Sequence, residues 1–145
     1  MTEQNPYQPP QSIVADPTQP NTVDIEMLPV SDTWKKRFRW IQAAGGPSLK
    51  NAKNVPKEQR LTFGLFNILA FLFGPLYYLA KGMWKRALMY SLILYSIIFV
   101  IAYVMIANGY EQHVNALGYG VAALFAMRAN LDYYKKMVLN DNGWF

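Results

Sequence analysis

Hydrophobic and polar positions divide the chain into a polar first part and a second part that contains three long apolar stretches. The clearest stretch is 87–107, which has 21 residues and no charge. As a helix it would extend about 31 Å, which matches the hydrocarbon core of a bilayer. Trp84 and Tyr90 lie near one end, and Tyr103 and Tyr110 near the other, as aromatic residues do at membrane interfaces. The pattern predicts a transmembrane helix over 87–107.

A second span is predicted over 112–130, because no charged residue occurs from Gln112 to Met127. Small residues recur there at every fourth position, a pattern that lets two helices approach closely. We expect this face to pack against 87–107; its residues are Gly118, Ala122 and Ala126. Arg128 and Asp132 follow one helical turn apart, and they are expected to form an ion pair at the membrane boundary.

The remaining apolar stretch, 61–80, has twenty uncharged residues and admits two interpretations. It is long enough to cross a bilayer, but Gly74 and Pro75 interrupt it, and proline removes a backbone donor and clashes with the preceding helical turn. The alternative to a full span is therefore a re-entrant or interfacial helical segment. Asn67 would lie inside the apolar region, where an unpaired amide is costly, and Asn130 is its expected partner.

The placement of charge favours the second interpretation. If all three stretches crossed the bilayer, cations would lie on both sides. If 61–80 enters and returns, all 14 lysines and arginines share one side, and the other side receives 108–115, where Glu111 is the one formal charge. Positive residues concentrate on the cytoplasmic side of membrane proteins. The sequence therefore predicts two spans, within a membrane domain over 61–138, with both termini cytoplasmic.

The polar first part begins with a proline-rich arm over 1–30. It cannot bury enough apolar surface to offset the entropy lost on ordering, so we predict that it is disordered. Residues 47–60 are predicted to form a basic linker, and 139–145 a short tail. The start of the chain has neither the basic nor the early apolar region of a cleavable signal peptide, so we expect none.

Between the arm and the linker, residues 31–46 predict a basic amphipathic helix that starts at Ser31 or Asp32 and ends at the glycine pair before Pro47. The apolar stripe consists of Trp34, Phe38 and Ile41. The opposite face is basic, with Lys35, Lys36 and Arg39. Such a helix suits a membrane surface. The same stripe would equally suit packing on the protein's own membrane domain. Both interpretations are compatible.

The net charge of +5 points to an anionic partner. The cations flank the apolar stretches, where anionic phospholipid headgroups attract each of them by about 1 kcal/mol. This placement favours phospholipid over nucleic acid. Besides the amphipathic helix, the residues expected at the lipid surface are Lys81, Trp84, Lys85 and Arg86.

Candidate chemistry is sparse. The chain has no cysteine, which excludes disulfides, thiolate nucleophiles and cysteine-bound zinc. His113 is the one histidine, and the acidic residues are too scattered to complete a metal site or a Ser-His-Asp set with it. We expect no catalytic residue, no metal site and no cofactor, and therefore no enzyme.

Several short motifs resemble a family of small bacterial inner-membrane proteins catalogued as a domain of unknown function. The main motif combines Phe66-Asn67, Ala70-Phe71, Phe73-Gly74-Pro75, Tyr77-Tyr78 and Lys81-Gly82-Met83-Trp84-Lys85. Further matches occur at Trp34-Lys35-Lys36 and at Tyr133-Tyr134-Lys135, so that the resemblance covers roughly residues 34–137. It implies a bacterial inner-membrane location and carries no known activity.

The sequence thus predicts an all-α membrane protein: two transmembrane helices and a re-entrant or interfacial helical segment, preceded by a basic amphipathic helix and a disordered arm. The expected function is that of a non-enzymatic scaffold or accessory protein that binds lipid and a membrane partner or a second copy. Two alternatives remain, an immunity or exclusion factor and an oligomeric transporter or channel component. Transport would require polar residues within the membrane, for which the candidates are Asn67, Ser91, Ser96 and Asn130.

Overall fold

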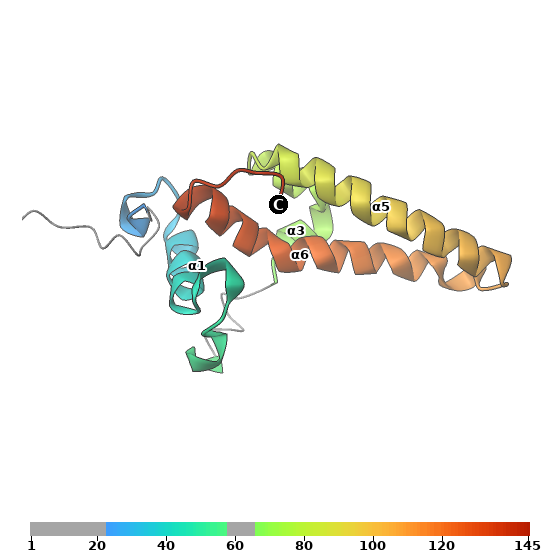
Figure 1. The fold of residues 1–145 in the computed structure, drawn as a ribbon, viewed down its shortest axis with the longest axis horizontal. Helices are drawn as coiled ribbons and strands as arrows, with labels where there is room; N and C mark the ends of the chain where they lie inside the picture. Colours follow the sequence, from blue (N-terminus) through green and yellow to red (C-terminus); the bar gives the residue numbers. More distant parts are fainter. Residues whose placement is uncertain (1–22, 58–65) are drawn as a thin grey trace, which may run out of the picture.

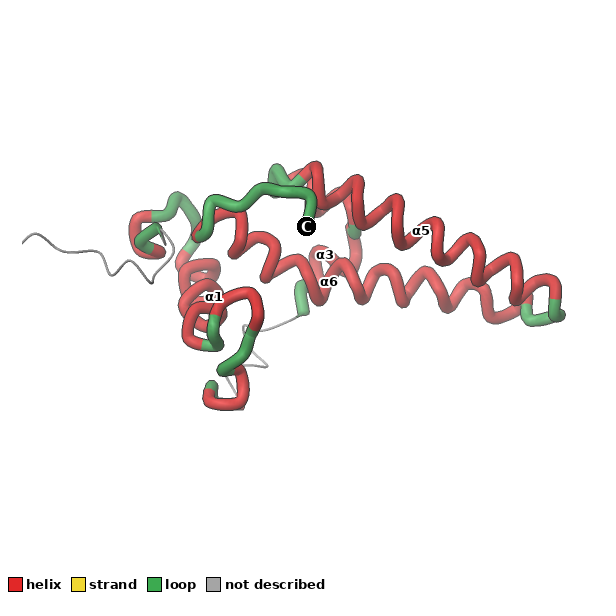
Figure 2. Tube along the Cα trace, in the orientation of Figure 1, coloured by secondary structure: helices red, strands yellow, loops and turns green. Residues whose placement is uncertain are grey.

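The computed structural model of the chain describes residues 23–57 and 66–145. Within these ranges the regular structure is entirely helical and contains no strand (Figure 2). Short 3-10 turns accompany five α-helices, which are α1 (Asp32–Ala43), α3 (Ile68–Phe73), α4 (Pro75–Ala80), α5 (Trp84–Ala107) and α6 (Val114–Val138). The all-α class predicted from the sequence is confirmed.

The long helices α5 and α6 form an antiparallel hairpin (Figure 1). No glycine or proline interrupts α5, which ends at Ala107 with Asn108 as its C-cap, and a short turn leads into α6. Helix α1 and the last residues of the chain lie at the end of the hairpin opposite this turn (Figure 1). We call that end the base of the hairpin.

The chain breaks at Gly74 and Pro75 into two six-residue helices, α3 and α4. Gly74 has φ 48° and ψ −122°, a conformation that a residue with a Cβ adopts only under strain. Pro75 is the first residue of α4, where its missing N–H costs nothing. The break therefore follows from two adjacent residues whose backbone properties exclude a continuous helix.

Helices α3 and α4 lie against the half of α6 that is nearer the base, entering beside its middle and leaving close to its end. At the entry, the Asn67 N–H donates to the carbonyl of Ala126 at 3.1 Å. At the exit, the Lys136 ammonium donates to the carbonyl of Lys81. Between these points the Gly74 turn reaches only as far along α6 as Phe125 and its neighbours, well short of the far turn. Residues 61–65 lie outside the described residues.

Only α5, among the described residues, is long and apolar enough by composition to cross a membrane. None of the residues in its most apolar 18-residue window is buried within the chain. Large apolar side chains such as Leu92, Phe99 and Val100 are instead more than half exposed. A core helix of a water-soluble protein would be covered by its own fold.

The end of the predicted disordered arm is ordered, which corrects the boundary at residue 30. The Val23 N–H donates to the carbonyl of Val138 at 3.2 Å, and a 3-10 turn covers Ile25–Met27. Ile25 and Leu28 are buried in the core at the base of the hairpin. These apolar side chains give the segment enough buried surface to order it. Residues 1–22 lie outside the described residues.

Candidate functional site at the base of the hairpin

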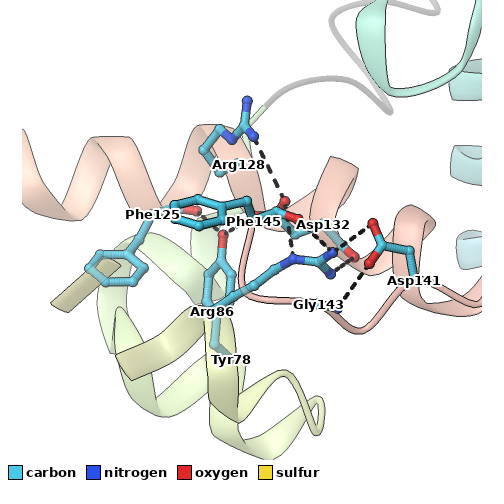
Figure 3. A network of polar contacts seen from close by, with 8 residues as sticks. All are labelled: Tyr78, Arg86, Phe125, Arg128, Asp132, Asp141, Gly143 and Phe145. Carbon is cyan, nitrogen blue, oxygen red and sulfur yellow. Dashed lines mark hydrogen bonds and ion pairs between the residues drawn. The ribbon is translucent and has the colours of Figure 1, made fainter. Parts of the chain in front are cut away.

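A buried ion-pair network joins α5, α6 and the last residues of the chain (Figure 3). Arg86 and Asp132 are both fully buried. Arg86 Nη1 donates to the backbone carbonyl of Asp132 at 3.1 Å, and Nε lies 3.9 Å from Asp132 Oδ1. Arg86 Nη2 lies 3.2 Å from Asp141 Oδ2 and donates to the carbonyl of Phe145 at 3.1 Å. One guanidinium therefore holds three segments together.

The Asp132 carboxylate also receives a contact from α4. The Tyr78 hydroxyl donates to Asp132 Oδ2 at 3.1 Å and lies 3.3 Å from the carbonyl of Phe125. Arg128, the partner expected from the sequence, has its Nη2 4.0 Å from Asp132 Oδ1, and its side chain is half exposed. The boundary pair is thus the outer edge of a network in which Arg86 is the buried cation.

The position of Arg86 corrects the expectation that it lies at the lipid surface. A buried arginine requires carboxylate compensation, and Asp132 and Asp141 supply it here. The sequence did not reveal the grouping of Arg86 with Asp132 and Asp141, because these three residues come from three segments and the far turn separates Arg86 from the two acidic residues. A usable signal was that Asp132 and Asp141 are the two acidic residues after Glu111, and both fall on the cationic side of the predicted topology.

The structure brings Asn67 and Asn130 together. Asn67 Nδ2 donates to Asn130 Oδ1 at 2.9 Å and to the Tyr77 hydroxyl at 2.9 Å, and both asparagines are buried. Asn67 Oδ1 accepts from the N–H of Ala70 at 3.1 Å, which caps the N-terminus of α3. Asn67 therefore starts α3, joins it to α4 and fixes it on α6.

The small-residue face of α6 is not packed against α5 as predicted. Ala126 is buried where α3 meets α6, whereas a Cβ built at Gly118 would meet no atom within 4 Å. Gly118 and Ala122 border an open cavity of about 240 Å³ that Gly74 and Tyr95 also line. The correction has a steric reason at Ala126, where α3 packs against α6, whereas the face stays open at Gly118.

Helix α1 packs its apolar stripe on the chain itself. Phe38 and Ile41 are fully buried, so of the two interpretations of the stripe, packing on the chain itself holds for them and exposure to lipid is excluded. The Trp34 and Tyr133 ring centroids lie 4.6 Å apart, and Phe38 lies 5.8 Å from Tyr134. The tyrosine pair of α6 supplies the aromatic surface that covers the stripe.

The remaining residues predicted for the membrane surface stay at least partly exposed. Lys36 and Arg39 lie on the exposed face of α1, and Arg39 pairs with Glu26 at 3.5 Å. Lys35 Nζ donates to the carbonyl of Glu26 at 2.8 Å. Trp84 is 48% exposed and forms an edge contact with Trp144, and Lys85 Nζ lies 5.9 Å from the Trp84 ring.

A basic aromatic pocket lies where α1 meets α3 and α4. Arg37 and Lys81 both approach the Trp34 ring, at 4.8 Å and 5.1 Å from its centroid, and Lys81 also lies 4.7 Å from that of Tyr133. Burial lowers the pKa of Lys81, and the neighbouring charges of Arg37 and Lys136 lower it further. Sequence reasoning did not single out Arg37, although it follows Trp34 by three residues on the same helix.

The described residues contain no cluster of three or more histidine or acidic side chains that could hold a metal ion. Glu111 and His113 lie at the far turn of the hairpin, away from the acidic residues at its base.

Comparison with known proteins decides the family. The sequence profile described as "Protein of unknown function (DUF2628)" matches residues 29–138. The chain belongs to the DUF2628 family. It is 32% identical over 123 residues to "Uncharacterized protein YigF" of Salmonella typhimurium and to the protein of the same name of Escherichia coli (strain K12), with 79% of this chain and 90% of each relative covered. No solved structure matches the chain.

The DUF2628 match covers each of the five α-helices named above for the described residues. It includes Arg86, Asp132, Asn67 and Asn130, and it ends before Asp141. The resemblance to a bacterial family of unknown function is therefore confirmed.

Proposed function

We propose that this DUF2628 protein is a multi-pass protein of the bacterial inner membrane, in which α5 and α6 cross the bilayer. The observation that carries the proposal is the segregation of charge along the hairpin. The described lysines and arginines belong to α1, the segment after it, the α4–α5 connection, the first turn of α5 and the second half of α6, which is the half on the side of the base (Figure 1). The far turn carries Glu111. Positive residues mark the cytoplasmic side, so both termini are cytoplasmic.

In this arrangement α3 and α4 form a re-entrant hairpin in the cytoplasmic leaflet. The outward face of α3 and α4 is apolar and more than half exposed within the chain, at Ile68, Leu69, Leu72, Phe73 and Leu76. Contact with lipid chains would cover this surface, as it would cover α5. The exit of the re-entrant hairpin lies at the base, where the Lys136 ammonium donates to the Lys81 carbonyl. Its entry lies beside the middle of α6, where the Asn67 N–H is bonded to the Ala126 carbonyl.

The activity that we propose is organisational: an accessory or scaffold protein that binds anionic phospholipid and a membrane partner or a second copy, without catalysis. Support comes from the use of the buried polar side chains. Arg86 and Asp132 hold segments of the chain together, and Asn67 and Asn130 fix α3 on α6. This use favours a structural role for the two asparagines over a transport path through them.

Cysteine labelling tests the topology, and the chain needs no prior cysteine removal because it has none. Single cysteines in place of Lys53, Lys85 and Asn142 should react with a membrane-impermeant maleimide only after the membrane is opened, whereas one in place of Gln112 should react in intact spheroplasts. Gly82 is unsuitable, because it has φ 68° and a Cβ there would lie within 3 Å of the Lys136 ammonium. Labelling of Lys85→Cys from outside would contradict the two-span arrangement.

The partner surface is tested at the open face of α6. Leucine at Gly118 meets no atom at its Cβ, so Gly118→Leu should fold normally and weaken association with a membrane partner or second copy about tenfold through lost close approach. Crosslinking in native membranes, followed by purification, measures the associated fraction. The matched control is Gly120→Leu, which is equally open but lies on another side of the helix. Equal association of both variants and the wild type would contradict a partner at Gly118.

A further inference from the structure

The basic aromatic pocket has the components of a binding site for one anionic amphiphile. It is a cavity of about 390 Å³. Its cations are Arg37 from α1 and Lys81 from the end of α4, and its rings are those of Trp34 and Tyr77. Residues from segments far apart in the sequence therefore converge on one cavity at the base of the hairpin.

The two cations lack compensation by a carboxylate within the part of the chain that the structure describes. The ion pairs there involve Arg39, Arg86 and Arg128, but neither Arg37 nor Lys81. Arg37 Nε is buried and has no hydrogen-bond partner. Both cations instead approach the same Trp34 ring, where they repel each other. An anion bound between them would supply the missing acceptor and relieve the repulsion.

The other wall of the cavity is apolar and continues onto the lipid-facing side of α3. Phe66, Ile68 and Leu69 line it and are 51%, 67% and 56% exposed. A free phosphate ion would contact only the cationic wall. A phospholipid would use both walls, with its phosphate at the cations and an acyl chain along α3.

We propose that this pocket binds one anionic glycerophospholipid molecule, with the lipid phosphate held between Arg37 and Lys81 and an acyl chain against Phe66, Ile68 and Leu69. The proposal rests on the membrane insertion proposed above, because the acyl wall belongs to the re-entrant hairpin. It goes beyond the proposed function because it assigns a site for one lipid molecule per chain, whereas general attraction to a charged surface would have no fixed stoichiometry. Trp34 shields the bound headgroup and aligns both cations through its ring face.

The test is a lipid titration of the full chain, purified and delipidated in a neutral detergent, with native mass spectrometry to count bound lipids. We expect one tightly bound phosphatidylglycerol, and weaker binding of phosphatidylcholine with the same acyl chains. Arg37→Gln and Lys81→Gln should each weaken the first binding step about tenfold, because each removes a charge-assisted hydrogen bond. Lys81→Arg should retain binding.

Lys36→Gln is the matched control, because it removes the same charge from the exposed face of α1 outside the cavity. Equal losses for Lys36→Gln and Lys81→Gln would overturn the proposal in favour of diffuse attraction. Equal binding of phosphatidylcholine, or displacement of the lipid by an equimolar amount of inorganic phosphate, would also overturn it. Thermal unfolding of each variant separates loss of the site from loss of the fold, and Arg37→Lys replaces Arg37→Gln if the latter unfolds.

Failure of the proposed topology would be visible independently, as external labelling of Lys85→Cys. Lipid binding in detergent does not depend on which side of a membrane the site faces. A chain with the expected labelling and no phosphatidylglycerol preference would overturn the lipid site alone.

Discussion

Arg86→Gln should destabilise the protein by about 3–5 kcal/mol. The substitution leaves the Asp132 carboxylate buried without its buried cation, and an uncompensated buried charge is far more costly than the net value of the pair. It also removes the donors to the Asp132 and Phe145 carbonyls, which detaches the last residues of the chain from α5. Reversible unfolding of the detergent-solubilised protein measures the change.

The control uses the second arginine beside the same carboxylate. Arg128 is half exposed and its Nη2 lies 4.0 Å from Asp132 Oδ1, so Arg128→Gln should cost about 1 kcal/mol or less. The double variant Arg86→Gln with Asp132→Asn should be more stable than the sum of the single losses predicts, because no buried charge remains. A larger loss for Arg128→Gln than for Arg86→Gln would show that the boundary pair, and not the buried network, carries the stability.

Phe38→Ala should lower the free energy of unfolding by about 3–5 kcal/mol, the range for truncating a fully buried aromatic side chain. Phe38 contacts Trp34 within α1 and the tyrosine pair of α6, with centroid distances of 5.5 to 5.8 Å. Its loss removes the centre of the contact between the two helices. Reversible unfolding of the protein in the same detergent measures the loss of stability. Increased protease sensitivity near α1 should accompany it.

Phe99→Ala is the matched control, because Phe99 is 74% exposed on α5 and has no packing role within the chain's core. It should change stability by less than about 1 kcal/mol in detergent. If Phe38 instead inserted into lipid, Phe38→Ala would weaken membrane association of α1 and leave stability unchanged. That pattern would contradict the packing of α1 on α6.

Predictions that depend on neighbouring residues followed from the sequence. The break at Gly74 and Pro75 is an example, since backbone strain at a positive φ and the missing proline donor act within two residues. The ends of α1 were similarly visible, because Ser31 precedes the first helical residue and the glycine pair follows the last turn. The length and composition of α5 were determined in the same way.

Predictions that depend on contacts between residues far apart in the sequence could not be made from local patterns. The sequence showed that α1 is amphipathic, but it did not decide whether the apolar stripe contacts lipid or protein. Lipid chains and a protein core are both apolar surroundings, and either would bury Phe38 and Ile41 favourably. The sequence placed Arg86 at the lipid surface because Arg86 follows Lys81 and Lys85 beside an apolar stretch, where cations meet lipid headgroups. The pairing of Asn67 with Asn130 was accessible as a hypothesis only because both are rare polar residues beside apolar stretches.

By itself, the sequence determined the helical class, the apolar α5, the break at Gly74 and Pro75 and the segregation of positive charge, because each depends on local backbone chemistry or on composition. Only the tertiary structure decided which cations are buried and which surfaces are covered. Arg86 is enclosed by carboxylates from two other segments, while Arg37 and Lys81 share one ring with no acidic partner among the described residues. The difference arises because charge compensation is set by distances in space, and neighbouring cations in the sequence can face entirely different surroundings.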